Sequence, residues 1–479
     1  MDLTRPLRWQ SATQAEQAEL ADLQANILKG HGRDFAQILF LGFDPKNPAA
    51  VRDCIRGLPV TDAWTQLQAA ARFRSRRAPG ASVLLIWLTA AGYRALGVPA
   101  AKTPSDPAFQ AGMPSRGTAL NDPPKNQWVA HFRHEVHAAV LVADDSQRGL
   151  TRTVKSLRAS LPKAVRVLGI ERGHAIRAPG PKGEGLEHFG FVDGRSQPLM
   201  LEEDVDWQRD HLDGTSVWNP AMPLGHALVA DPGSSSGGFG SYLVFPRLRQ
   251  DVPGFRVAER RLAHALSLKG PARARAGAML VGRFRDGTPL VAQHAAGVES
   301  PVPNNFDYRD DPEGLKCPFQ AHIRKVNPRG ESIPGVPAAP AERAHGIVRR
   351  GIPYGRASGT VLKGAVQRGS PAHGEVGLLF MCYQADIGRQ FEFMQARWAN
   401  NRSFVSPNIH AGGPVTGLDP IIGQSDPQGV VADPGHWFNA HWGGPLAQAD
   451  RRQCVVSDLV TLRGGEYFFA PSLSALKAL

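Results

Sequence analysis

The chain has 479 residues, a formal net charge of +12 and an apolar fraction of 42%. This length exceeds what one small core needs, so at least two domains are expected. No stretch approaches the roughly 18 uninterrupted apolar residues of a membrane-spanning helix, and the N-terminus shows no apolar signal core. The four cysteines lie far apart, without zinc, disulfide or CxxCH spacing. We therefore expect a protein of the reducing cytoplasm.

The positive charge comes mostly from arginine that is spread evenly along the chain. No long basic run and no basic–aromatic stripe is present, so the charge does not predict nucleic-acid binding. A basic surface instead favours small anionic ligands.

Strand and helix patterns alternate in the first half of the chain. Three- and four-residue apolar spacing predicts a helix over 16–29. Similar patterns predict strands over 35–43, 82–89, 136–142 and 165–170, and helices over 45–71 and 146–161. This order is typical of a ferredoxin-like α+β unit.

The second half repeats the same mixture of elements after a Gly-, Pro- and Ser-rich stretch at 220–240. Strands are predicted over 241–245, 278–282, 347–352, 376–383 and 459–469, and helices over 258–268 and 387–400. No sequence repeat is visible. We therefore predict two α+β domains, residues 1–200 and residues 201–479.

One loop carries an acid between two glycines, in Gly190-Phe-Val-Asp193-Gly194-Arg-Ser-Gln-Pro198. Glycine frees the backbone on both sides of Asp193, so the loop can aim its carboxylate. Taken alone, the loop is better explained as an ordinary Asp-Gly turn. A functional interpretation needs partners for Asp193 elsewhere in the chain.

His322 and Arg349 are the candidate partners, although a structural histidine and a surface ion pair are the simpler interpretations of each. A neutral imidazole can hold a haem iron from one side. A carboxylate can move a proton between the oxygens of peroxide, and a guanidinium stabilises the negative charge that develops as the O–O bond breaks. These residue types suit a haem peroxidase, but composition by itself does not select this triple from others.

Ordered motifs across most of the chain resemble the dye-decolorising peroxidase family of haem enzymes. Residues 190–194 match its GxxDG motif, 321–324 (Ala-His-Ile-Arg) its proximal-histidine segment, and 349–355 (Arg-Arg-Gly-Ile-Pro-Tyr-Gly) its distal-arginine segment. Further similarity lies at 23–33, 241–245 and 391–395. The resemblance implies two ferredoxin-like domains in a dimeric α+β-barrel arrangement, with haem between them or within the C-terminal domain.

The resemblance also implies site roles. His322 would be the axial ligand of one non-covalent haem b, Asp193 the acid–base group, and Arg349 the distal cation. Three side chains are further candidates for a haem propionate: Arg350, which alternatively pairs with protein, and His31 and Arg33. A ligating histidine usually donates its second N–H to an acceptor. Glu392 is the predicted acceptor, although an exposed surface position for Glu392 explains the sequence equally well.

The implied activity is hydrogen peroxide-dependent, one-electron oxidation of bulky aromatic substrates such as anthraquinone-type dyes and phenols. The basic surface favours anionic dyes. Because aspartate has a reference pKa of about 4, the predicted activity optimum lies below neutral pH. Tyr354 and Trp398 are candidates to carry electrons outward, although ordinary core packing explains both more simply.

Three other interpretations stay open, one of which is a non-haem binding module with a basic surface. A protein for haem storage, sensing or iron release would need His322 without Asp193 and Arg349. Cys317 could ligate haem as a thiolate, but no cysteine-ligand loop of the usual type surrounds it. Neither the physiological reductant nor the oligomeric state follows from the sequence.

Overall fold

The computed structural model describes residues 1–78, 80–178, 183–331, 340–356, 374–405, 416–425, 436–444 and 451–479. Its central feature is an 11-stranded antiparallel sheet. Strand β11 pairs with β10 and also with β8, so the sheet closes on itself as a barrel. The strands in the order around the sheet are β11 (Gly377–Leu379), β10 (Ile352–Tyr354), β4 (Val165–His174), β1 (Phe35–Phe43), β3 (Ala138–Asp144), β2 (Val83–Leu88), β15 (Val460–Ala470), β8 (Phe239–Gln250), β12 (Cys382–Gln384) and β9 (Val348–Arg349), with β7 (Val229–Ala230) beside β8.

Helices cover the outside of this barrel. Every residue of β2 is buried, because side chains on one face fill the barrel and those on the other meet helices. The covering helices are α1 (Gln14–Asp22), α2 (Pro48–Arg56), α3 (Ala63–Arg76), α4 (Ala90–Ala95), α5 (Pro107–Ala111), α6 (Gly117–Leu120), α7 (Gln147–Ser160) and α13 (Leu473–Ala478). Side-chain caps begin several of them; Asp62, for example, accepts the amide of Thr65 at 2.7 Å.

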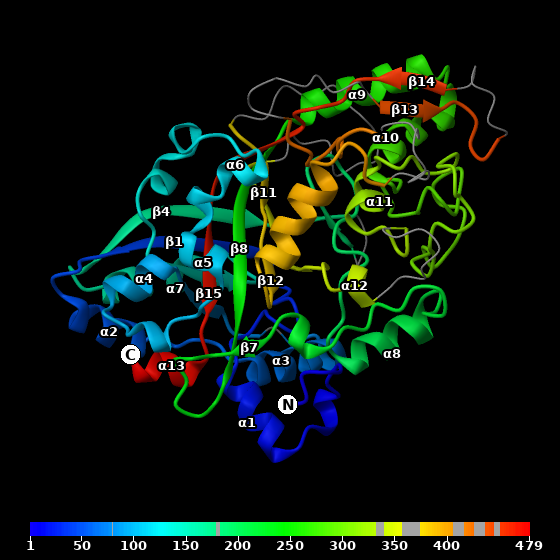
Figure 1. The fold of residues 1–479 in the computed structure, drawn as a ribbon. Helices are drawn as coiled ribbons and strands as arrows, with labels where there is room; N and C mark the ends of the chain where they lie inside the picture. Colours follow the sequence, from blue (N-terminus) through cyan, green and yellow to red (C-terminus); the bar gives the residue numbers. More distant parts are fainter. Residues whose placement is uncertain are drawn as a thin grey trace.

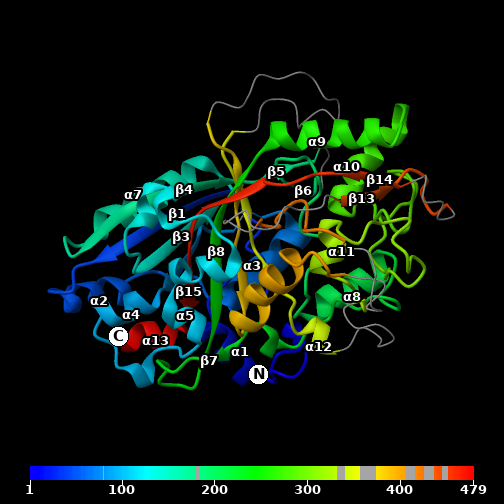
Figure 2. The ribbon, with the colours of Figure 1, turned by 45° about the horizontal axis from the view of Figure 1, so that its top comes forward.

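A second hydrophobic core lies beside the barrel, built from residues between 189 and 321 and between 421 and 460. Figure 1 and Figure 2 both show α9, α10 and α11 together on one side of the barrel, with the hairpin β13–β14 beside them. The elements of this region are β5 (Ile176–Arg177), β6 (Gly185–Leu186), α8 (Glu202–His211), α9 (Val252–Ala265), α10 (Ala274–Val281), α11 (His322–Val326), α12 (Pro340–Arg343), β13 (His436–Asn439), β14 (Arg451–Cys454) and the π-helical turns Gly388–Glu392 and Met394–Ala399.

The α+β class and the barrel agree with the sequence analysis, whereas some local predictions are wrong. The single helix expected over 45–71 is two helices, α2 and α3, separated by residues 57–62. Instead of the strand expected at 278–282, residues 278–281 belong to α10, which ends at Val281 and is capped by Gly282 with φ +96°. The helix expected over 16–29 ends at Asp22, because Leu23 is extended and Gln24 instead bonds to the backbone of Ile86.

The boundary expected at residue 200 stays a prediction, and the barrel includes strands from both sides of it. None of the helices in the described ranges has the length and apolar character that crossing a bilayer requires.

Candidate active site

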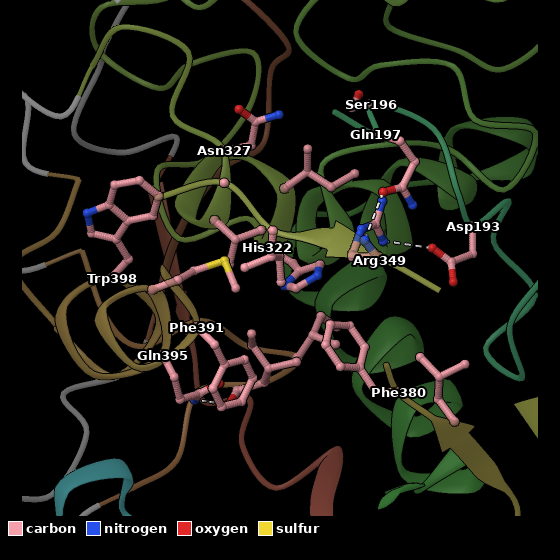
Figure 3. A pocket seen from close by; sticks show the side chains of 18 of the residues that line it. Asp193, Ser196, Gln197, His322, Asn327, Arg349, Phe380, Phe391, Gln395 and Trp398 are labelled. Carbon is pink, nitrogen blue, oxygen red and sulfur yellow. Dashed lines mark hydrogen bonds and ion pairs between the residues drawn. The ribbon is translucent and has the colours of Figure 1, made fainter. Parts of the chain in front are cut away.

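A cavity of about 290 Å³ lies where the barrel meets the second core. Its wall combines the Asp193 loop, β8, β9, α11 and the π-helical turns, and most of the lining side chains are apolar. Figure 3 shows His322, Arg349 and Asp193 around this cavity, with Phe380, Phe391 and Trp398 among the apolar side chains. The candidate residues from three distant segments therefore share one site.

The Asp193 loop is held by its own backbone. Gly190 and Gly194 adopt φ values of +92° and +99°, which side chains disfavour. The carboxylate of Glu187 accepts the amides of Phe189 and Phe191 at 2.8 and 2.9 Å. The amide of Asp193 donates to the carbonyl of Gly185 at 2.9 Å. These bonds fix where the Asp193 side chain begins.

Arg349 and Asp193 form an ion pair. Nη1 of Arg349 lies 2.9 Å from Oδ1 of Asp193, and its Nη2 donates to the carbonyl of Arg195 at 3.0 Å. The backbone amide of Arg349 also donates to Gln197 Oε1 at 3.2 Å. Both charged side chains keep about a third of their surface exposed, 30% for Arg349 and 33% for Asp193. A small molecule in the cavity can therefore reach both.

His322 is the first residue of α11, and its ring is held by a hydrogen bond to Asp419. Its Nδ1 lies 2.7 Å from Oδ2 of the buried Asp419, whose other oxygen accepts the amides of Ile421 and Ile422. Burial alone would raise the pKa of Asp419, but the His322 contact and these amides outweigh it and hold that pKa below its usual value. Among the described residues none bonds to Nε2 of His322, so this nitrogen is available on the cavity side.

Glu392 is not the partner of His322, and that prediction is wrong. Its carboxylate binds Arg116 through two contacts of 2.8 Å and accepts the hydroxyl of Tyr467 at 3.0 Å. Asp419 takes the predicted role instead, 97 positions from His322. Sequence reasoning missed Asp419, because nothing in its local sequence distinguishes it from a loop aspartate.

The three candidates for a propionate partner do not line the cavity. Arg350 donates to the carbonyls of Asn26 and Ile27, and Arg33 pairs with Asp145. His31 accepts the backbone amide of Arg33 through Nδ1. Burial, with the neighbouring charges of Arg33 and Arg350, lowers the pKa of His31 to about 4, so it is a neutral acceptor near neutral pH.

Arg283 is a cavity-lining cation that sequence reasoning missed. Its guanidinium is buried and donates to Ser196 Oγ and Asn304 Oδ1 at 2.9 and 2.8 Å. Within the described ranges no carboxylate lies at ion-pair distance from it. Burial, together with the nearby charge of Arg329, lowers its pKa to about 9, so it is still protonated at neutral pH. A buried positive charge of this kind suits an anionic group of a bound ligand.

Comparison with known proteins identifies the family of this chain. Residues 22–177 match the DyP dimeric alpha+beta barrel domain and residues 257–406 match the Dyp-type peroxidase C-terminal domain. The chain is 45% identical to the multifunctional dye peroxidase DyP2 of Amycolatopsis sp., with all of both chains covered. The chain belongs to the DyP-type peroxidase family.

Solved structures of DyP-type proteins share its fold. DyP2 from Amycolatopsis sp. superposes with a TM-score of 0.92 at 42% identity, covering all of both chains. A DyP-type peroxidase from Anabaena sp. has a TM-score of 0.88 at 34% identity and covers 99% of this chain and 98% of its own. These likenesses confirm the α+β fold with its barrel and C-terminal domain, and the assignment to a haem-dependent oxidoreductase family acting on peroxide.

Proposed function

We propose that this DyP-type protein uses hydrogen peroxide to oxidise aromatic substrates such as anthraquinone-type dyes and phenols by one-electron steps. The ion pair between Asp193 and Arg349, in the same cavity as the anchored His322, is the observation that carries this proposal. The likeness to a dye peroxidase over the full length of both chains supports the substrate class.

The residues of the cavity fit haem b. His322 offers Nε2 for the iron, with its orientation set by Asp419 as is usual for ligating histidines. Apolar side chains suit the macrocycle, and the charge of Arg283 suits a propionate. Haem, when bound, supplies an iron centre that exchanges electrons with peroxide and substrate.

Asp193 and Arg349 have distinct roles in the proposed reaction. The Asp193 carboxylate accepts the proton of one peroxide oxygen and returns it to the other, which leaves as water. Arg349 orients this carboxylate through the 2.9 Å contact and stabilises the negative charge that develops as the O–O bond breaks.

Replacing Asp193 by Asn tests the proposal. Asn keeps the size of the side chain but cannot accept the proton, so peroxide turnover should fall about a hundredfold to ten-thousandfold. The absorption spectrum of the bound haem should stay, whereas His322→Ala should lose the haem or change its ligation. Asp310→Asn, on the exposed surface, is the control for the chemical change. Full turnover in the Asp193 variant would contradict the proposal, and a haem-loaded wild type without turnover would favour a haem-handling protein.

A further inference from the structure

The Asp193 loop brings a second polar side chain to Arg349. Gln197 lines the cavity together with Asp193 and Arg349. Its Oε1 accepts the backbone amide of Arg349 at 3.2 Å. Because a backbone amide can only donate, the atom beside it must be the side-chain oxygen of Gln197. The orientation of this side-chain amide is therefore fixed, and its nitrogen faces away from the Arg349 backbone.

The nitrogen of this amide is an unused donor. Over the part of the chain that the structure describes, no group accepts a hydrogen bond from Nε2 of Gln197. This atom is not sealed by protein either, so a small molecule in the cavity can reach it. In Figure 3, Gln197 and Asp193 both bond to Arg349 from the same loop. Two N–H donors are thus available close to the proposed acid–base pair.

The backbone just before Gln197 is held in an unusual conformation. Ser196 has φ +57°, which residues with a side chain rarely adopt. Its hydroxyl accepts hydrogen bonds from Arg283 and Arg329 at 2.9 and 2.8 Å. The same hydroxyl donates to Asn304 Oδ1 at 2.7 Å, and all three partners are buried. Strain that is held by so many contacts is typical of functional sites, and here it sets the position from which Gln197 reaches Arg349.

Support of the Arg349 backbone does not by itself call for a glutamine. That contact needs only an acceptor oxygen, whereas glutamine also carries two N–H donors. Hydrogen peroxide has two O–H groups that donate and oxygens that accept. Asp193 offers an acceptor for it, and Gln197 and Arg349 offer donors. The polar groups of the site therefore match the hydrogen-bonding groups of one small molecule.

We propose that Gln197 is a further peroxide-binding residue, whose Nε2 donates a hydrogen bond to a peroxide oxygen. This inference rests on the proposed function, in which peroxide is the ligand and Asp193 accepts its proton. A side-chain amide keeps its own protons at any working pH, so Gln197 does not compete with Asp193 for the transferred proton. Its task is to orient the peroxide beside the carboxylate.

Fluoride titration of the haem-loaded ferric protein tests this donor without peroxide. Fluoride is a small anion that accepts hydrogen bonds and donates none, and its binding is followed by the absorption spectrum of the haem. Gln197→Leu should weaken fluoride binding by at least about tenfold, because a hydrogen bond to a charged acceptor is lost. Gln147→Leu makes the same change at an exposed position of α7 and should leave fluoride binding unchanged.

Gln197→Glu separates donation from support of Arg349. Its carboxylate can still accept the Arg349 amide but has no N–H. Fluoride should therefore bind this variant no better than Gln197→Leu. A crystal structure of the wild type with fluoride should place Nε2 of Gln197 about 2.7–3.2 Å from the ion. The haem spectrum of both variants shows that they fold and bind the cofactor.

Each outcome decides the question. Equal fluoride affinity in the wild type and Gln197→Leu, wild-type affinity in Gln197→Glu, or a bound ion beyond reach of Nε2 would overturn the proposal. No fluoride binding to the wild type would overturn it as well. Fluoride binding that depends on Gln197 in a wild type without peroxide turnover would overturn the proposed function alone. In an active enzyme, Gln197→Leu should lower kcat/KM for peroxide about tenfold and leave KM for the reducing substrate unchanged.

Discussion

Asp419 holds His322 by the ring nitrogen that faces away from the cavity. The contact is 2.7 Å, and two backbone amides on the other carboxylate oxygen keep Asp419 from turning. An anionic acceptor at Nδ1 makes the imidazole a stronger electron donor at Nε2. The proposed iron ligand is thus tuned by a residue that does not line the cavity.

Asp419→Asn should reveal this tuning. A neutral amide is a weaker hydrogen-bond acceptor for the Nδ1 proton than a carboxylate, so the imidazole becomes a weaker electron donor at Nε2. The reduction potential of the bound haem should therefore rise. Peroxide turnover should fall about 10- to 100-fold. Spectroelectrochemical titration of wild type and variant measures the potential directly. An unchanged potential would mean that Asp419 only supports the loop.

His31 serves the fold as a neutral acceptor, which gives it a pH signature. Its pKa is lowered to about 4 in the folded protein, below the ordinary 6.5. The unfolded chain therefore binds more protons between these values, and the contribution of His31 to stability is present above pH 6.5 and is lost as the pH falls towards 4.

His31→Asn should make the acid side of the stability profile shallower. Asn can accept the Arg33 amide through its side-chain oxygen but does not titrate. The free energy of unfolding, measured by urea at several values between pH 7 and pH 4, should fall less steeply in the variant than in the wild type. Parallel profiles would contradict the prediction.

At the scale of elements, the π-helical turns connect the cavity to the barrel. Met394, Gln395 and Trp398 line the cavity, while Glu392 turns towards Arg116 and Tyr467. In Figure 3, Phe391, Gln395 and Trp398 approach the cavity from this one segment. Side chains of these two short π-helical turns therefore lie on two sides: some line the cavity, and Glu392 contacts Tyr467 of the barrel strand β15.

Glu392→Ala should weaken the fold rather than the chemistry. The change leaves the buried Tyr467 hydroxyl and the Arg116 guanidinium without their acceptor, which costs about 2–3 kcal/mol of unfolding free energy. Asp53→Ala breaks an exposed pair with Arg56 and should cost less than about 0.5 kcal/mol. Denaturant titration compares the two, and a cost equal to that of the surface pair would contradict the assigned role.

At the scale of the whole molecule, the last strand completes the barrel. β15 pairs with β8 over most of its length and touches β2, so the C-terminal strand lies between an N-terminal strand and one from the middle of the chain. The barrel core therefore forms only when distant parts of the chain have met, and the cavity beside it depends on that closure.

Phe468→Ala tests the role of this strand. Phe468 is fully buried against Phe40 and Trp87, with ring centroids 6.5 and 6.2 Å away. Its loss should cost about 3–5 kcal/mol, because the packed barrel cannot collapse into the space. Phe73→Ala, at a ring 43% exposed, should cost less than about 0.5 kcal/mol. A small effect at Phe468 in thermal or denaturant unfolding would show that β15 is dispensable to the core.

The sequence by itself determined the α+β class, the family and the three central residues of the proposed site. Asp193, His322 and Arg349 stand in motifs whose glycines and neighbours are local, so these residues can be found without knowing the packing. Most strands were predictable for the same reason, since alternation and apolar runs are properties of short segments. The strand expected at 278–282 failed because a short apolar run fits a buried helix equally well.

Only the tertiary structure decided which side chains meet. Asp419 and Glu392 are both acids far from His322 in sequence, and the path of the chain after α11, not a local pattern, brings one of them to the ring. The two arginines Arg350 and Arg283 are a second example. The guanidinium of Arg350 donates to the carbonyl of Asn26 away from the cavity, whereas Arg283 lines the cavity. Partner choice depends on distances between segments, and those distances are set by how the barrel and the second core pack together.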